Sequence, residues 1–172
     1  MKQKVRKGLF ETNSSSTHSI VIGNNGEDIY ANLPEEVYFG GGEFGWEHEE
    51  YRDTQSKADY LYTVIVKQDL LEAIPYITET LKKWGVNAKF QELEDKTSWN
   101  GAYTYKDFSN FCYVDHSYEA KELVEDILKD EALLMNYLFS DGSFIETGND
   151  NDDTEFTAKY PQNVLLDYYK GN

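Results

Sequence analysis

The apolar residues of this chain repeat at helical spacing in three separate stretches, and this periodicity constrains the fold more than any other feature. In the clearest stretch, from about Tyr118 to Phe139, one face carries Leu123, Val124, Ile127, Leu128, Leu134, Met135 and Leu138. Spacings of three and four residues place such side chains on one side of a helix. The pattern therefore predicts one long helix, which the Asp141-Gly142 pair ends.

A second helical stretch covers residues 58–66, and either Asp53 or Thr54 is suited to cap its N-terminus. The stretch contains the β-branched run Thr-Val-Ile-Val, which is typical of strands. A strand over the same residues is therefore the alternative interpretation.

The third stretch covers residues 70–84, and Gly85 follows it where a helix commonly ends. Pro75 lies inside this stretch and has no backbone N–H to donate. We therefore expect the helix either to kink at Pro75 or to start its second half there.

Strand signals fill the intervals between these stretches. Aromatic or β-branched runs lie at 19–22, 35–47, 87–93, 103–114 and 143–148, with turn signals at Asn25-Gly26 and Asn100-Gly101. The last ten residues suit a short helix or a strand. Because helices and strands do not alternate regularly, the parallel α/β class is disfavoured. The sequence predicts a single compact α+β domain over 1–172, whose mixed or mostly antiparallel sheet packs against two or three helices.

The charge of the chain limits its partners. It has 32 acidic and 16 basic residues, for a formal net charge of −16, and residues 1–7, expected to form a basic arm or edge strand, hold four of the bases. A nucleic-acid binder needs a cationic surface that releases counterions. We therefore expect no direct binding to nucleic acid or to an anionic membrane, and a protein with a basic surface is the expected partner.

Cys112 is the single cysteine, so the chain contains neither an internal disulfide nor a cysteine-based zinc site. No apolar run reaches the roughly 18 residues of a membrane-spanning helix, and no secretory signal pattern begins the sequence. A cytoplasmic protein is expected.

A run of polar residues precedes the first apolar strand, in the segment FETNSSSTHSIVI. Its candidate ligand-binding residues are Thr12, Asn13, Ser14, Ser15, Ser16, Thr17 and His18. A loop of hydroxyl groups and backbone N–H groups can hold a phosphate, a carboxylate or a sugar. The alternative is an ordered turn whose hydroxyl groups bind its own backbone.

The longer segment RKGLFETNSSSTHSIVI resembles the N-terminus of a group of small proteins from phages and Firmicutes. The resemblance extends to GEFGWE, YVDHS and FIETGNDN, and so touches most of the chain. It implies a phage or prophage setting, with the host cytosol as the compartment, and a functional role for the polar run. It implies no activity, cofactor or catalytic residue.

Two further motifs carry side chains suited to chemistry. In GGGEFGWEHEE, Glu43 and Glu47 suit acid–base work and Trp46 suits stacking on a planar ligand, unless the glycines serve only to bend a sheet. In YVDHS, Asp115 and His116 lie where a strand is expected to lead into a helix, so both can reach one site. A serine of the polar run would complete a nucleophilic triad, whereas the alternative is a helix cap beside an ordinary histidine.

An acidic loop follows the last of these strands. Its candidate partner-binding residues are Asp150, Asp152, Asp153 and Glu155. A calcium-binding EF-hand loop starting at Asp150 would need glycine and glutamate where Glu155 and Pro161 stand, so no metal site is assigned. No cofactor is expected either. The loop suits electrostatic binding to a basic protein, and solubility is the alternative explanation of its charge.

Two functional hypotheses follow from the sequence. The first is a phage-type binding protein that inhibits a host defence protein or a nucleic-acid-handling protein. The second is a small enzyme or ligand-sequestering protein, with a polar pocket built from the Thr12–His18 loop and the Asp115-His116 junction. Whether the protein is an enzyme is left open by the residues.

Overall fold

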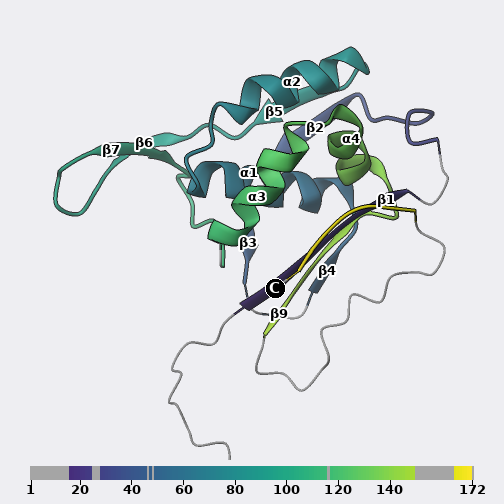
Figure 1. Cartoon of the computed structure of the whole chain (residues 1–172). Coiled ribbons are helices and arrows are strands. Elements are labelled where there is room, and N and C mark those ends of the chain that lie inside the picture. The colour runs from purple at the N-terminus through teal and green to yellow at the C-terminus, as the bar shows by residue number, and fades with distance from the viewer. Residues whose placement is uncertain are drawn as a thin grey trace, which may run out of the picture.

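The computed structural model describes residues 16–24, 28–45, 47, 49–115, 117–149 and 165–171. The helices in this part of the chain are α1 (Thr54–Lys67), α2 (Ala73–Lys83), α3 (Ser117–Ile127) and α4 (Glu131–Phe139). Figure 1 shows the helices grouped on one side of the main sheet. The predicted α+β class is confirmed.

The main sheet has four antiparallel strands in the order β10-β1-β9-β4. They are β10 (Leu165–Gly171), β1 (Ser16–Asn24), β9 (Phe144–Asn149) and β4 (Glu49–Tyr51). The sheet thus joins the two ends of the described chain, as the purple and yellow strands in Figure 1 show. The C-terminal stretch is a strand rather than a helix.

Three strand pairs complete the described fold. Two are parallel: β2 (Glu36–Phe39) pairs with β5 (Asn87–Phe90), and β3 (Glu43–Phe44) pairs with β8 (Tyr113–Val114). The third is the antiparallel hairpin of β6 (Glu94–Thr97) and β7 (Thr104–Asp107). The strands are therefore of mixed direction.

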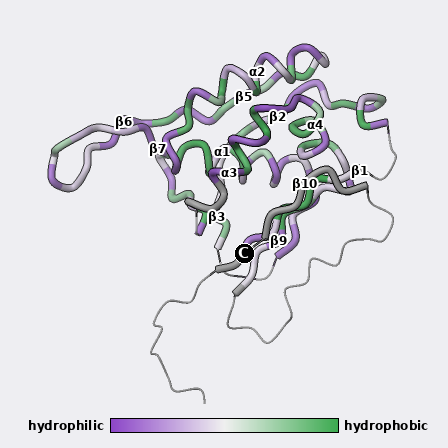
Figure 2. Tube along the Cα trace, in the orientation of Figure 1, coloured by the Kyte–Doolittle hydropathy of each residue, from purple (hydrophilic) through white to green (hydrophobic). Residues whose placement is uncertain are grey.

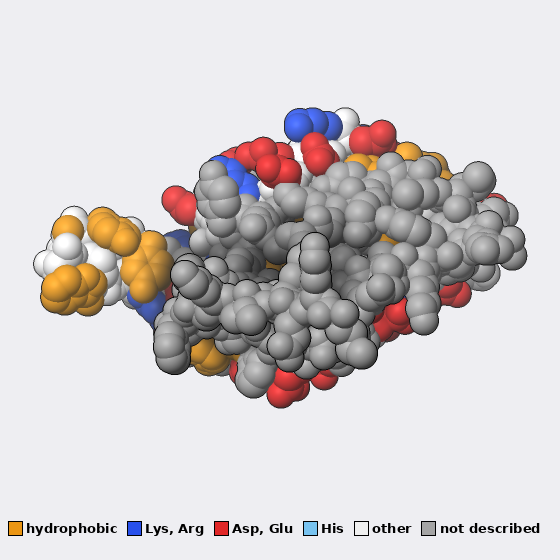
Figure 3. All heavy atoms as spheres, turned by 60° about the horizontal axis from the view of Figure 1, so that its bottom comes forward, with side chains coloured by type: hydrophobic (Ala, Val, Ile, Leu, Met, Phe, Trp, Pro, Cys, Tyr) orange, Lys and Arg blue, Asp and Glu red, His pale blue; other side chains and the backbone are white. Residues whose placement is uncertain are grey.

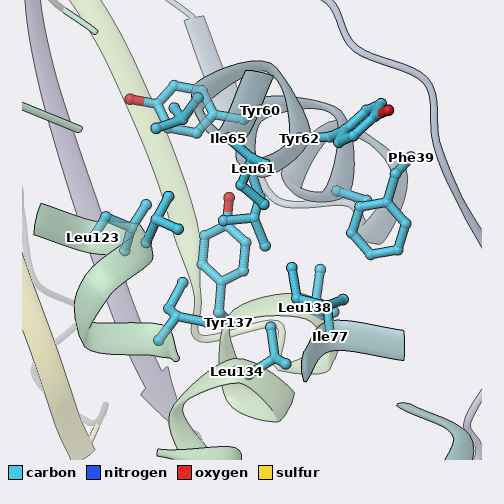
Figure 4. Packing of buried hydrophobic residues seen from close by; sticks show 14 of the residues in the cluster. Phe39, Tyr60, Leu61, Tyr62, Ile65, Ile77, Leu123, Leu134, Tyr137 and Leu138 are labelled. Carbon is cyan, nitrogen blue, oxygen red and sulfur yellow. The ribbon is translucent and has the colours of Figure 1, made fainter. Parts of the chain in front are cut away.

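Helix α1 forms the centre of the core. The seven residues 60–66 are all buried, so this part of the helix is enclosed on every side. Figure 2 shows hydrophobic residues concentrated where α1, α3 and α4 meet, and Figure 4 shows Tyr137 pointing from α4 toward Leu61 of α1. The Tyr137 hydroxyl donates a hydrogen bond to the Lys57 carbonyl at 2.8 Å. Burial on all sides explains why a β-branched run is helical here, because tertiary packing overrides propensity.

Two of the predicted helices have different boundaries in the structure. The helix predicted over 118–139 is two helices, because the Asp130 carboxylate accepts hydrogen bonds from the N–H groups of Ala132 and Leu133 at 2.8 and 3.2 Å and starts α4 afresh. The described fold therefore has four helices instead of two or three. Helix α2 begins at Ala73 without a kink, since Pro75 lies in its first turn, where a missing N–H breaks no helical bond.

The polar run also differs from its prediction as a loop. Strand β1 starts at Ser16, so Ser16, Thr17 and His18 belong to the sheet. His18 pairs with Thr147 of β9, and the pairing with β9 continues from Ser16 to Val21. The backbone bonds to β9 extend the strand into residues that hydropathy alone assigns to a loop. The basic arm and the residues Thr12, Asn13, Ser14 and Ser15 lie outside the described residues.

Candidate functional site

A polar pocket lies where edge strand β4 meets the β3–β8 pair. Its volume is about 230 Å³, and its lining residues are Glu43, Gly45, Glu47, Glu49, Tyr51 and Tyr113. We call it the acidic pocket. Carboxylates and phenol rings lining one small pocket make it the best candidate for a functional site in the described part of the chain.

Strand β4 places Glu49 and Tyr51 on the same side of the sheet, because alternate strand residues face one way. The Tyr51 hydroxyl donates a hydrogen bond to the Glu49 carboxylate. Burial is the largest cause that raises the pKa of Tyr51, and this hydrogen bond is the second largest. Tyr51 therefore stays a neutral hydrogen-bond donor at physiological pH.

The opposite wall of the pocket comes from β3 and β8. Glu43 and Tyr113 are paired neighbours on these strands, and the Tyr113 N–H donates to the Gly42 carbonyl at 2.9 Å. A Cβ atom at Gly45 would lie 2.9 Å from the Tyr113 hydroxyl oxygen. Glycine at position 45 therefore lets the phenol ring lie against the backbone of the pocket. The Thr147 hydroxyl of β9 donates to the Glu47 carbonyl at 2.7 Å and so fixes the backbone at Glu47 next to β9.

The glycine run before β3 brings the backbone close to α1. The N–H of Gly40 donates to the Asp59 carboxylate at 2.7 Å, and the N–H of Gly42 donates to the Thr63 hydroxyl at 2.9 Å. Gly41 has a φ of +75°, and a Cβ atom there would lie 2.5 Å from the Phe108 ring. The run thus does more than bend a strand: it fixes the start of β3, and with it Glu43, against the core.

The charge in the acidic pocket is uncompensated within the described chain. None of Glu43, Glu47 and Glu49 forms an ion pair with a described lysine or arginine. Cations that do pair with other carboxylates are Arg52, Lys67, Lys83, Lys89, Lys96, Lys106, Lys121 and Lys129. Most described lysines and arginines therefore already pair with carboxylates outside the pocket. The carboxylates of Glu43, Glu47 and Glu49 can thus bind a cationic group that enters the pocket.

A chain of aromatic contacts connects His18 to this pocket. The buried His18 has its Nδ1 atom 3.1 Å from the Tyr60 hydroxyl. Tyr60 packs edge-on against Phe44 with 5.0 Å between ring centroids, and Phe44 packs edge-on against Tyr51 at 5.3 Å. Neither His18 nor Phe44 lines the pocket itself, but these buried rings lead from His18 to Tyr51, which does line it.

The structure brings together some of the predicted site residues. Glu43 and Glu47 line the same pocket, and the Asp115 N–H donates to the Phe44 carbonyl at 2.9 Å, which places the backbone of Asp115 beside β3. Asp115 is not among the lining residues. Outside the described residues are Trp46, His116, Asp150, Asp152, Asp153 and Glu155, and nothing is described of the side chains of Ser16 and Thr17.

Glu49, Tyr51 and Tyr113 line the pocket but were not predicted as site residues from the sequence. A signal for the first two is present, since Glu47, Glu49 and Tyr51 alternate and a strand would turn such residues to one face. No comparable local signal points to Tyr113, whose place in the pocket depends on the parallel pairing of β8 with the distant β3.

Two general properties of the described chain bear on its chemistry. Nowhere in the described segments do three or more histidine, cysteine, aspartate or glutamate side chains group in a way that could hold a metal ion. Within those same segments, no helix has the length and apolar character needed to cross a bilayer.

A comparison with protein-family models, curated proteins and solved structures found no match to this chain.

Proposed function

We propose that this protein acts by binding a partner protein with a basic surface, and that its acidic pocket receives a lysine or arginine side chain of that partner. The observation that supports this function is the set of three pocket carboxylates without a described cationic partner, next to two phenol rings. A carboxylate forms strong charge-assisted bonds with a guanidinium or ammonium group. The rings of Tyr51 and Tyr113 offer such a cation a favourable aromatic surface as well.

The overall charge supports the same proposal. A net charge of −16 attracts a basic surface over a distance and accelerates encounter with it. Proteins that handle nucleic acids carry such basic surfaces because they neutralise phosphates. Together with the resemblance to small phage proteins, this makes a host defence protein or a nucleic-acid-handling protein the target that we propose. Binding there would be inhibitory, and the host cytosol would be its setting.

A second candidate function uses the same pocket for a small cationic molecule. The pocket is small, Asp115 donates its N–H to the carbonyl of the neighbouring Phe44, and His18 reaches the Phe44 ring through Tyr60. A polyamine carries ammonium groups that single carboxylates can bind one at a time. In this case the protein would sequester or transform a ligand instead of blocking a protein.

Charge-matched variants test the principal proposal. The variant E43Q/E47Q/E49Q removes the pocket charges, whereas E35Q/E79Q/E92Q removes three exposed carboxylates outside the pocket. Binding of an arginine–glycine repeat peptide is measured by calorimetry at low and high salt. Each charge-assisted bond lost costs about 1.5–3 kcal/mol, so the pocket variant should bind at least about 100-fold more weakly. The control should lose only the few-fold effect of a weaker long-range field.

The outcomes separate the possible binding surfaces and ligands. Equal weakening in both variants would show that only net charge matters and would contradict the pocket. The variant D150N/D152N/D153N tests the acidic loop in the same assay, and unchanged affinity would remove that loop from the interface. Spermidine binding that matches peptide binding and depends on Glu43, Glu47 and Glu49 would favour the small-molecule function.

A further inference from the structure

An exposed aromatic side chain adjoins the acidic pocket on its β8 side. Phe111 is 73% exposed, and its ring centroid lies 5.2 Å from that of Tyr113, which lines the pocket. Single exposed apolar residues are common on protein surfaces, so the exposure of Phe111 alone assigns it no role. Its contact with a ring of the pocket makes it an extension of the candidate site.

Strand alternation turns both rings of this pair to the outside. Cys112 and Val114 are buried, so the residues between and before them, Phe111 and Tyr113, face the other way. Glu43, the register partner of Tyr113 on β3, is exposed on the same outer face. Hydrocarbon from Phe111 therefore continues directly into the carboxylates and phenol rings of the acidic pocket.

The backbone beneath the two rings is fixed on both sides of Phe111. The Tyr113 N–H donates to the Gly42 carbonyl at 2.9 Å, and the side-chain amide of Gln91 donates to the Asn110 side-chain oxygen at 2.8 Å. A ring that is presented by a fixed backbone binds a partner with a smaller loss of conformational entropy. The arrangement of Phe111 beside the pocket is thus in place before a partner arrives.

We propose that the acidic pocket and Phe111 together recognise an extended segment in which an apolar side chain lies two residues from the lysine or arginine. This deepens the proposed function and rests on it, because the pocket must hold the cationic side chain. In an extended chain, side chains two residues apart point the same way and are about 7 Å apart. That spacing carries the second side chain past Tyr113 and onto Phe111, where only an apolar group gains by covering the ring.

The occupant that we propose is therefore a segment of the basic partner protein. A second copy of this chain is disfavoured, because each copy carries a net charge of −16 and the two would repel each other. The three pocket carboxylates, which form no ion pair with a described lysine or arginine, instead favour a segment that brings its own cation.

Two peptides of equal composition, both with blocked ends, test the spacing. Gly-Leu-Gly-Arg-Gly-Leu-Gly has its leucines two residues from the arginine, and Gly-Gly-Leu-Arg-Leu-Gly-Gly has them one residue away. Calorimetry measures the binding of both to the wild type, F111S, the pocket variant E43Q/E47Q/E49Q and the control W99S. Trp99 is 99% exposed at the tip of the β6–β7 hairpin, whose hydrophobic side chains stand clear of the rest of the molecule in Figure 3.

We expect the wild type to bind the first peptide about fivefold more tightly than the second, the effect of a leucine partly removed from water. F111S should bind both peptides as weakly as the wild type binds the second. W99S should behave as the wild type does. The second peptide also shows that the pocket is intact in F111S, because its arginine still needs the pocket and its leucines do not reach position 111.

The outcomes separate this proposal from the proposed function. Equal affinity of the wild type for the two peptides, or an equal loss for both in F111S, would overturn the role of Phe111 while leaving the pocket in place. Binding that does not depend on Glu43, Glu47 and Glu49 would overturn the proposed function and the recognition of the segment together. Sedimentation that shows a dimer of the wild type but not of F111S would assign the ring to a second copy and so contradict the proposal.

Discussion

The acidic pocket and the β6–β7 hairpin both present tyrosine rings at the surface, but in different electrostatic settings. Tyr51 and Tyr113 share their pocket with three glutamates that form no ion pair with a described lysine or arginine. The two lysines of the hairpin, Lys96 and Lys106, both pair with carboxylates of the hairpin itself, Asp107 and Asp95. The pocket therefore attracts a cationic group, whereas the charges of the hairpin largely compensate one another.

The two regions also differ in their connection to the core. Phe44 is buried behind the acidic pocket and contacts both Tyr51 and Tyr60, so the pocket wall is an extension of the hydrophobic core. The hairpin tip is held by its own turn, and only its base reaches the core. Substitution of the buried residue behind the pocket should therefore change stability, whereas removal of the exposed Trp99 side chain at the tip should not.

The largest difference is expected between Phe44→Ala and Trp99→Ser. Removing the buried Phe44 ring leaves a cavity, so the free energy of unfolding should fall by about 3–5 kcal/mol. Trp99→Ser removes an exposed side chain and should change this free energy by less than about 0.5 kcal/mol. Urea unfolding followed by circular dichroism measures both. Similar losses of unfolding free energy in the two variants would contradict the expected difference between the buried Phe44 and the exposed Trp99.

A second prediction concerns the pH dependence of stability that a buried lysine of α1 causes. Lys57 on α1 is buried, its ammonium donates to the carbonyls of Ser140 and Ser143 at 3.0 and 3.3 Å, and burial lowers its pKa to about 8. Between pH 8 and its ordinary value of 10.5, the unfolded chain holds a proton that the folded chain has released. Stability should therefore rise with pH in this window, by at most about 1.4 kcal/mol per pH unit.

The free energy of unfolding at several pH values checks this prediction. K57M should remove the rise, whereas K89M, at an exposed lysine, should keep it. At higher pH the trend should reverse, since burial raises the pKa of Tyr62 to about 12 and the unfolded chain loses the phenol proton first. A curve for the wild type that is flat between pH 8 and 10 would contradict the buried position of Lys57.

Two glycines offer a third comparison between the regions. A methyl group at Gly45 would meet the Tyr113 hydroxyl, so Gly45→Ala should displace the ring and weaken binding of the arginine peptide about tenfold, a loss of about 1.4 kcal/mol. At Gly101 nothing lies within 4 Å, but the φ of +69° strains any other residue. Gly101→Ala should cost about 1–2 kcal/mol of stability and leave peptide binding unchanged. Calorimetry and urea unfolding measure the two effects.

The smallest effect is expected at the exposed pair of the hairpin. Lys106→Gln breaks the pair with Asp95, and exposed pairs contribute about 0–1 kcal/mol. Asp107→Asn at the base of the hairpin breaks the 2.6 Å pair with Lys67, which is more shielded from water, and should cost more. Melting temperatures compare the two variants. A larger loss in K106Q than in D107N would contradict the larger contribution that we expect from the more shielded pair.

The sequence predicted those helices and strands in which the buried residues are apolar and repeat at regular spacing. Helix α1 was found because its apolar repeat is helical and Asp53 caps it, with its carboxylate accepting from the Ser56 N–H at 2.8 Å. The break between α3 and α4 was missed because the apolar stripe continues on both sides of Asp130. The start of β1 at Ser16 and the short strand β4 were missed because their residues are polar, and only pairing with β9 makes them strands.

The candidate site was predictable only in part for the same physical reason. Glu43 and Glu47 were found through the unusual glycine-rich segment around them. The pocket itself depends on contacts between strands far apart in the chain, such as β3 with β8, and local patterns do not encode such pairings. The predictions for Trp46, His116 and the loop from Asp150 to Glu155 lie outside the described residues and stay predictions.

An NMR titration with a matched pair of peptides tests the central claim most directly. The glycine-flanked arginine peptide Gly-Arg-Gly and its citrulline counterpart differ by one charge at nearly equal shape. We predict that the arginine peptide shifts the backbone resonances around Glu43, Glu49 and Tyr113 with a dissociation constant at least about tenfold lower than that of the citrulline peptide. Equal shifts from both peptides, or shifts confined to residues outside the pocket, would contradict a cation-binding role for the acidic pocket.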